Sequence, residues 1–175
     1  MNKETFDKIF KFATKQNKDR FYEPLTRYMV KYEINTLERM SMFLSNVIHE
    51  SGSLRYVKEL ASGAAYEGRK NLGNVVAGDG IRYKGRGLIQ VTGRANYNKI
   101  SKDTGIMFIS NPELLEAPEY AAMSACWFWD SNNLNKVADS GDFKEVVKII
   151  NGGYNGWIDR VQWYNHTKKI LSEVY

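Results

Sequence analysis

The chain has 175 residues, of which 43% are hydrophobic and 26% are charged, and its formal net charge is +5. This length and composition predict one globular domain with its own core and exclude an intrinsically disordered chain. The single cysteine, Cys126, excludes an internal disulfide, and its apolar neighbours predict a buried thiol. No apolar run reaches membrane-spanning length, and the first residues lack the pattern of a signal peptide.

Apolar residues at helical spacing predict three helices in the first fifty residues. The first spans 4–16, and Glu23-Pro24 is expected to interrupt the chain before the second. The third begins after a cap at Asn35 or Thr36. It carries a single apolar stripe made of Leu37, Met40, Leu44, Val47 and Ile48.

Residues 61–87 change character, because seven of the chain's 14 glycines lie within them. Glycine at this density makes helix improbable and predicts a long irregular segment. Such a segment inside a compact domain is usually functional. After it, residues 88–92 are expected to form a short strand or a helix entry, and residues 96–100 a helix.

The second half of the chain predicts further helices. Pro112 favours a helix start, and a helix over 119–130 is apolar nearly all round, so it is expected to be central and buried. Asp142 can cap a helix that runs to Ile150, and the last helix spans about 156–171. The predicted fold class is therefore mainly α, in one domain over 1–175, with a long Gly-rich insert.

Two carboxylates flank a break in the third helix. In an unbroken helix, Glu50 and Glu59 would lie on opposite faces and about 13.5 Å apart along the axis. Ser51-Gly52-Ser53 favours leaving the helix, so a turn there can bring Glu59 back to face Glu50. Two carboxylates across a cleft suit acid/base cleavage of a glycosidic bond. The alternative is that both are ordinary surface glutamates.

Other catalytic patterns are missing from the sequence. A zinc helix would need a second histidine four residues after His49, and the only other histidine is His166. Gly85-Arg86-Gly87 completes neither phosphate-binding loop, and no serine-nucleophile motif is present. We therefore expect no metal and no cofactor, and we expect His49 to hold the helix end by a hydrogen bond.

Four motifs follow one another along the chain: FLSNVIHESG at 43–52, NLGN at 71–74, GDGIRYKGRGLIQVTG at 78–93 and INGG at 150–153. Together they resemble the chitinase-like domain of glycoside hydrolase family 19, in its bacteriophage endolysin branch. The resemblance spans most of the chain. It implies a mainly α, lysozyme-like fold with two lobes, a sugar-binding cleft and at most a small β-hairpin.

The resemblance also implies a mechanism. The family hydrolyses β-1,4 bonds of N-acetylated amino sugars with inversion, and its general acid falls on Glu50. The general base maps best onto Glu59, with Thr92 helping to hold the attacking water. The implied substrate-binding residues are Gln90 and Tyr97 lining the cleft, Tyr66 stacking on sugar, Asn151 contacting sugar and Arg160 orienting a carboxylate.

The chain departs from the plant members of that family. Their two glutamates are much further apart in sequence, and they carry several disulfides, whereas only Cys126 is present here. The short spacing leaves a competitor for the general base, Glu67 in Tyr-Glu-Gly-Arg. We prefer Glu59 and leave the choice to the structure.

These observations predict an endolysin that hydrolyses peptidoglycan glycan strands, without a separate cell-wall-binding domain. Its basic charge suits an anionic wall polymer. We expect a monomer made in the host cytoplasm without a signal peptide, released to the periplasm with a holin, and neither inserted in membrane nor bound to nucleic acid. The alternatives are a chitinase, a lytic transglycosylase or muramidase and, without catalysis, a basic module that binds cell wall or nucleic acid.

Overall fold

The computed structural model covers residues 1–175 and places helix α3 (Leu37–Ser51) within a helical lobe. The Thr36 side chain caps this helix by accepting a hydrogen bond from the backbone N–H of Arg39. Residues 40–48 are all buried, and α3 packs along helix α9 (Trp157–Ser172). The predicted cap and apolar stripe are therefore confirmed.

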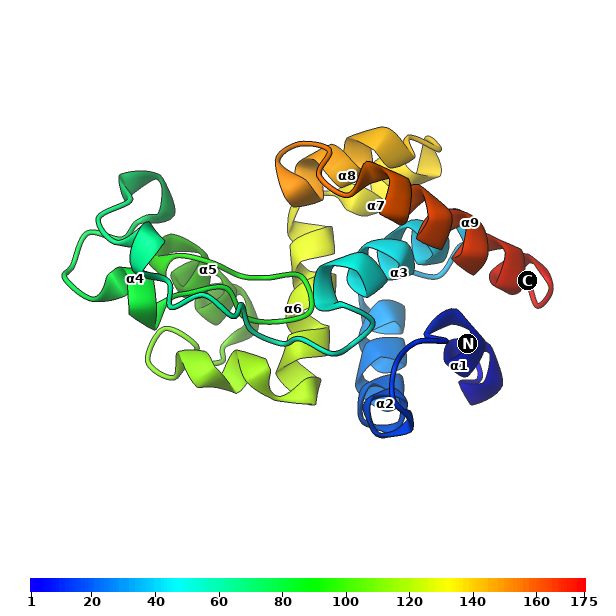
Figure 1. Cartoon of the computed structure of the whole chain (residues 1–175), viewed down its shortest axis with the longest axis horizontal. Helices are drawn as coiled ribbons and strands as arrows, with labels where there is room; N and C mark the ends of the chain where they lie inside the picture. Colours follow the sequence, from blue (N-terminus) through cyan, green and yellow to red (C-terminus); the bar gives the residue numbers. More distant parts are fainter.

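The other helices of this lobe surround α3 and α9 (Figure 1). They are α1 (Lys3–Ile9), α2 (Lys15–Lys31), α6 (Pro118–Ser131), α7 (Leu134–Asp139) and α8 (Phe143–Asn151). Helix α6 is buried over almost its whole length and contains Trp129 and Cys126, both fully buried, as predicted for the central helix. Burial raises the pKa of the Cys126 thiol well above its usual value.

The predicted boundaries of the first two helices are wrong. Helix α1 ends at Ile9, and Thr14 caps a new helix by accepting from the backbone N–H of Asn17. That helix, α2, runs straight through Pro24 instead of breaking there. An interior proline costs roughly 3 kcal/mol. Here the buried apolar face of α2, which packs against α6, offsets that cost.

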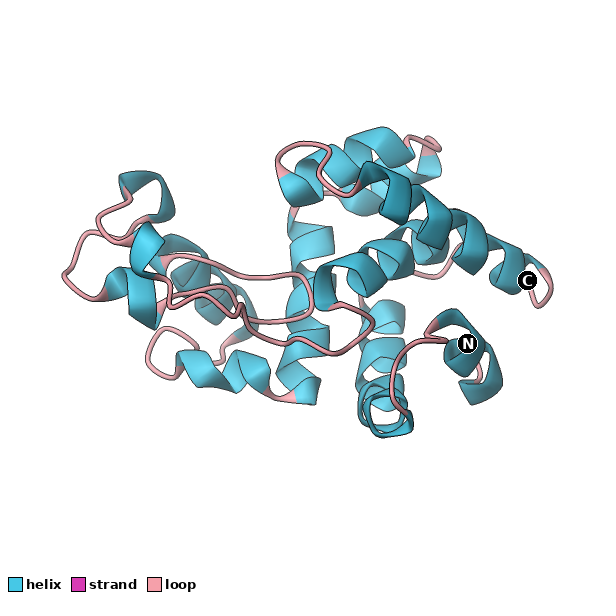
Figure 2. Cartoon of the chain, viewed as in Figure 1, coloured by secondary structure: helices cyan, strands magenta, loops and turns pink.

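Residues 52–117 form a second, smaller lobe made mostly of loops, which we call the small lobe (Figure 2). Its short elements are η1 (Ala64–Tyr66), η2 (Lys70–Leu72), α4 (Asp79–Arg82), α5 (Arg94–Thr104) and η3 (Pro112–Glu116). Residues 88–92 form neither strand nor helix, because two backbone hydrogen bonds between Arg86 and Val91 close a turn over residues 87–90. The Leu88 backbone N–H donates to Ala121 on α6. Isolated bridges join Arg86 to Lys58 and to Val91.

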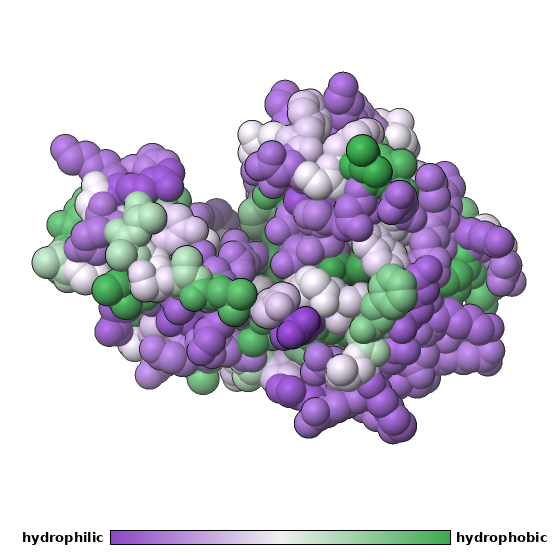
Figure 3. All heavy atoms as spheres, in the orientation of Figure 1, coloured by the Kyte–Doolittle hydropathy of each residue, from purple (hydrophilic) through white to green (hydrophobic).

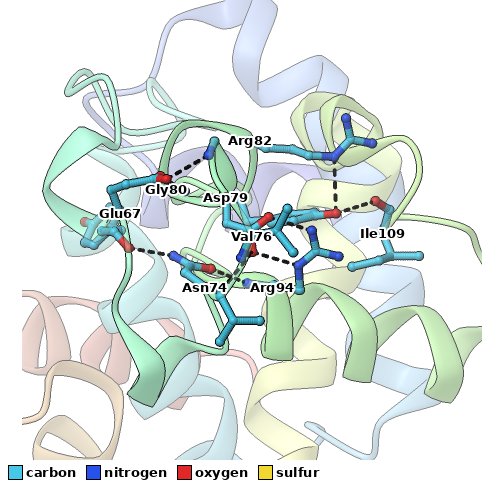
Figure 4. Close-up of polar contacts among 12 residues, drawn as sticks. Glu67, Asn74, Val76, Asp79, Gly80, Arg82, Arg94 and Ile109 are labelled. Atoms are coloured by element: carbon cyan, nitrogen blue, oxygen red, sulfur yellow. Dashed lines mark hydrogen bonds and ion pairs between the residues drawn. The ribbon is translucent and has the colours of Figure 1, made fainter.

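Polar contacts fix the loops of the small lobe (Figure 4). The buried carboxylate of Asp79 accepts from the backbone N–H groups of Val75 and Val76 and from the guanidinium of Arg94. Arg94 holds the pKa of Asp79 below its usual value. A buried carboxylate that accepts this many hydrogen bonds fixes the surrounding turns relative to one another.

The two lobes meet at the C-terminal end of α3. In the space-filling view the surface is hollowed between the small lobe and the part of the helical lobe that carries α7 and α8 (Figure 3). The mainly helical, two-lobed architecture is as predicted. None of the helices combines the length and the apolar character needed to cross a bilayer.

Candidate active site

Glu50 lies in the last turn of α3, where the two lobes meet. Its side chain is 24% exposed, and its Oε1 atom accepts a hydrogen bond from Nη2 of Arg160 at 2.5 Å. Arg160 is on α9 and is almost fully buried. The Oε2 atom of Glu50 makes no hydrogen bond within the protein, so one oxygen is held and the other is left for a ligand.

A buried network holds the guanidinium of Arg160 in place. Arg160 donates to Oδ1 of Asn46 at 2.7 Å and to the backbone oxygen of Asn155 at 3.0 Å. Asn46 is fully buried, and its amide in turn donates to the backbone oxygen of Met42. Sequence reasoning did not single out Asn46. Its position could have indicated this role, because a polar residue four positions before Glu50 lies on the same face of the helix.

The helix break after Glu50 is present as predicted. Gly52 ends α3 in the left-handed region at φ +56°, and Ser53 and Leu54 follow there at +59° and +67°. The Ser51 hydroxyl stabilises this turn by accepting from the backbone N–H of Leu54. Non-glycine residues in this region cost roughly 1–3 kcal/mol each. The strained turn redirects the chain from the helical lobe into the small lobe.

Glu59 lies on the small-lobe side of the junction. Its backbone N–H donates to the Gly85 oxygen, which ties it to the Gly-rich motif. The hydroxyl of Tyr66 donates to Oε2 of Glu59 at 2.8 Å, whereas Oε1 is buried without a hydrogen-bond partner. Burial raises the pKa of Tyr66, and its hydrogen bond to Glu59 adds to the rise. Tyr66, predicted to stack on sugar, therefore holds the Glu59 carboxylate through its hydroxyl.

Gly85 brings Gln90 close to Glu59. An ideal Cβ on Gly85 would lie 2.5 Å from Oε1 of Gln90 and 3.1 Å from Oε2 of Glu59. Both polar side chains thus pack over the bare backbone of Gly85, where any larger residue would displace them. Gly85 is a site residue that the sequence prediction did not name, although the motif contained it.

Glu67, the competitor for the general base, is engaged elsewhere. Its Oε1 atom accepts from the backbone N–H of Gly78 at 2.7 Å, and its Oε2 atom accepts from that of Gly80 at 2.9 Å. Figure 4 shows the carboxylate turned toward α4. With both oxygens bound to backbone, Glu67 stabilises a turn of the small lobe, and Glu59 is the carboxylate with an unpaired, buried oxygen.

Two further predicted residues carry unpaired polar groups. The hydroxyl of the half-buried Thr92 makes no hydrogen bond within the protein, and its backbone oxygen accepts from the Asn96 amide. At the end of α8, Nδ2 of Asn151 is buried without a partner. Buried polar groups are rarely left unpaired, so Asn151 is available to a ligand oxygen.

The prediction that Tyr97 lines the cleft is wrong. Tyr97 is fully buried on the inner face of α5, packed against Tyr83. Its hydroxyl donates to the backbone oxygen of Lys84 at 2.7 Å and accepts from the buried guanidinium of Arg86 at 3.0 Å. Burial raises the pKa of Tyr97. The residue supports the Gly-rich motif from beneath and does not reach substrate.

His49 has the structural contact expected for it. Its Nδ1 atom lies 2.6 Å from Oδ2 of Asp159, so the imidazole joins the end of α3 to the first turn of α9. The imidazole occupies the space beside Gly156, where a side chain would collide with it. No group of three or more His, Cys, Asp or Glu side chains is arranged to hold a metal ion.

A mainly helical, two-lobed fold with a glutamate at the end of the helix where the lobes meet is that of a lysozyme-like glycoside hydrolase. The family model described as chitinase class I matches residues 46–154, which include Glu50, Glu59 and Asn151. The chain belongs to glycoside hydrolase family 19.

Several proteins of known sequence are similar to this chain. A glycosyl hydrolase family 19 domain-containing protein of Haemophilus influenzae is 28% identical, covering 91% of this chain and 92% of its own. Endochitinase A of Zea mays is 30% identical over 69% of this chain. Endochitinase At2g43620 of Arabidopsis thaliana is 34% identical over 65%. The chain spans only 42% and 39% of these two plant proteins.

Solved structures share the fold. Chitinase C from Streptomyces griseus HUT6037 superposes with a TM-score of 0.80 at 25% identity, covering 98% of this chain and 76% of its own. A bacterial family 19 chitinase superposes with a TM-score of 0.81 at 22% identity, covering 97% and 94%. The second likeness concerns the fold alone.

Proposed function

We propose that this enzyme hydrolyses the β-1,4-glycosidic bonds of peptidoglycan glycan strands with inversion, as an endolysin. One observation carries the reaction type: Glu50 and Glu59 come from different lobes, and each has one oxygen held by the protein and one without a protein partner. Carboxylates presented in this way from two sides suit a pair that acts on opposite faces of one sugar.

In the proposed reaction, Glu50 donates a proton to the glycosidic oxygen while Glu59 takes a proton from the attacking water. An inverting pair stands about 6.5–9.5 Å apart, which leaves room for that water. The unpaired hydroxyl of Thr92 is a candidate to hold the water. Arg160 keeps Glu50 aimed at the bond, and the free amide of Asn151 is a candidate contact for sugar.

The charge distribution supports an anionic glycan as substrate. The small lobe, residues 52–117, contains ten Lys and Arg against six Asp and Glu, so it accounts for +4 of the total +5. Peptidoglycan carries carboxylates on its stem peptides, and on lactyl groups that carry no peptide. A net positive charge on the small lobe raises the local concentration of such a polymer, with a strength that falls as salt increases.

The endolysin role completes the proposal. The enzyme is made in the host cytoplasm, crosses to the wall through holin lesions and acts there as a monomer. Neither nucleic acid nor stable membrane insertion has a part in this role.

A chitinase is the second candidate, favoured by the endochitinases of Zea mays and Arabidopsis thaliana to which the chain is similar. Both activities use the same carboxylate pair and differ in the substituents that the cleft accepts. The two candidate functions can therefore be distinguished only by measuring the activity of the same protein on both substrates.

Mass spectrometry of digested peptidoglycan after borohydride reduction tests the proposal. We expect reduced sugar ends, whose identity reports which bond is cut, and NMR of fresh digests should show the α-anomer. A 1,6-anhydro product would instead assign a lytic transglycosylase, and cleavage of chitin oligomers alone would assign a chitinase. A Glu50→Gln variant that clears wall suspensions at the wild-type rate would refute the catalytic role.

A further inference from the structure

A second hollow of about 580 Å³ opens on the helical lobe beside the end of α3. The α1–α2 connection, the C-terminal end of α3 and the first turns of α9 enclose it. Neither Glu50 nor Glu59 lines it. The side chains that matter here are Phe12, His49, Ser53, Arg55, Asp159 and Trp163.

One wall of this hollow is aromatic. Phe12 is 73% exposed, and its ring meets the ring of Trp163 edge to face with centroids 5.6 Å apart. A large exposed aromatic side chain beside a concave surface commonly marks a binding site. The two rings stand nearly perpendicular to each other, and the ammonium of Lys11 lies 5.1 Å and 5.5 Å from their centroids. The C–H face of a pyranose can pack against the face of one ring, beside this positive charge.

The opposite side of the hollow offers polar groups. Arg55 is exposed and forms no ion pair within the protein, and its guanidinium lies over the Tyr56 ring, 5.2 Å from the ring centroid. Its N–H groups have no carboxylate partner and can bind a ligand carboxylate with two parallel hydrogen bonds. Ser53 is only 7% exposed, and its hydroxyl is buried without a hydrogen-bond partner. An unpaired buried hydroxyl at the edge of a hollow gains a partner when a ligand oxygen arrives.

The hollow is coupled to the cleft through the helix. Consecutive helix residues point about 100° apart, so His49 faces the hollow while Glu50 faces Arg160. His49 and Asp159 both line the hollow, and the contact between them joins α9 to the end of α3. A strand bound in the hollow would therefore enter or leave the molecule next to the catalytic acid.

We propose that this hollow binds a carboxylate-bearing amino sugar of the strand being cut, such as an N-acetylmuramic acid residue whose lactyl carboxylate carries no stem peptide. The sugar ring packs on Phe12 and Trp163, and its carboxylate pairs with Arg55. The Ser53 hydroxyl hydrogen-bonds to a ligand oxygen. The identity of the sugar rests on the proposed function, in which peptidoglycan is the substrate. The chemistry of the site, exposed aromatic rings beside a guanidinium without an ion-pair partner, does not depend on it.

Titration of the full chain with N-acetylmuramic acid, followed by amide and indole NMR, tests the site directly. We expect shifts at Ser53 and at the Trp163 indole, and at least tenfold weaker binding of N-acetylglucosamine. Arg55→Gln and Phe12→Ala should each weaken binding at least fivefold. Both side chains are exposed, so the variants should fold. Lys102→Gln removes an equally exposed charge elsewhere and should change nothing.

Equal affinity for the two sugars, or unchanged affinity in Arg55→Gln, would overturn the proposal. Measuring the turnover of peptidoglycan distinguishes a failure of this inference from a failure of the proposed function. If the wild type binds N-acetylmuramic acid here but leaves peptidoglycan uncut, the site stands and the proposed function fails. If the wild type cuts peptidoglycan and neither Arg55→Gln nor Phe12→Ala raises KM, the hollow is not used and this inference fails alone.

Discussion

Neutralising Glu59 and neutralising Glu67 should have opposite consequences, although the two glutamates lie only eight residues apart. Glu59→Gln is expected to remove activity and leave stability nearly unchanged. Glu67→Gln is expected to lower stability and leave turnover nearly unchanged. The reason is that Glu59 has a carboxylate oxygen without a partner, whereas both oxygens of Glu67 accept backbone N–H groups.

The contacts set the size of each effect. In Glu67→Gln the new amide NH₂ must face one of two N–H donors, so one charge-assisted hydrogen bond is lost and the other is weakened. With a discount for solvent exposure, this costs roughly 1–2 kcal/mol. For a domain of this size each kcal/mol lowers Tm by about 2–4 °C, which predicts a fall of roughly 2–8 °C. Loss of a general base lowers kcat about 10²–10⁴-fold.

The assay pairs calorimetry with initial rates on a soluble amino-sugar oligomer for the wild type and both variants. Glu59→Asp serves as a matched control, since it keeps the charge but withdraws the carboxylate, and should retain a small part of the activity. If Glu67→Gln were inactive at unchanged Tm while Glu59→Gln remained active, the assignment of the base would be reversed and the reasoning refuted.

Three further predictions concern the support of the site. Asn46→Ala should lower kcat roughly tenfold at nearly constant KM, because Arg160 loses one of its hydrogen-bond acceptors; an unchanged kcat would show that Asn46 is not needed. Gly156→Ala should lower the free energy of unfolding in urea by roughly 1–3 kcal/mol, because φ is +73° and the added carbon meets His49; wild-type stability would contradict this. The pKa of Asp79 is lower in the folded protein than its unfolded value of 3.8, so its contribution is present above that pH and is lost as pH falls through the folded pKa. Asp79→Asn should therefore be less stable at pH 7 and lose less stability on acidification, and parallel curves would argue against the role of Asp79.

Local signals in the sequence were sufficient for the elements that the site depends on. The cap at Thr36, the apolar stripe of α3 and the break at Gly52 each depend on a few neighbouring residues, and all are present. The apolar segment around Cys126 likewise predicted the buried central helix α6. These features follow from backbone preferences and periodicity, which act over one or two helical turns.

The wrong predictions concern residues whose positions depend on contacts between segments that are distant in the sequence. Pro24 stays inside α2 because α6 covers that helix, and Tyr97 turns inward to hydrogen-bond with Lys84 and Arg86. The free oxygen of Glu59 and the occupied ones of Glu67 depend on where Tyr66 and α4 lie. No spacing within the chain encodes such pairings, so the choice between two carboxylates required coordinates.

The position of the small lobe in the chain has a consequence for engineering. The chain enters it once, after α3, and leaves it once, before α6, so residues 52–117 form a single continuous cassette. Glu50, Arg160 and Asn46 all belong to the frame outside that cassette. Exchanging the loops around η1, η2 and α4 would thus reshape the small-lobe side of the proposed cleft while Glu50 and the residues that hold it stay in place. The small-lobe loops can in this way be redesigned separately from Glu50, the proposed proton donor.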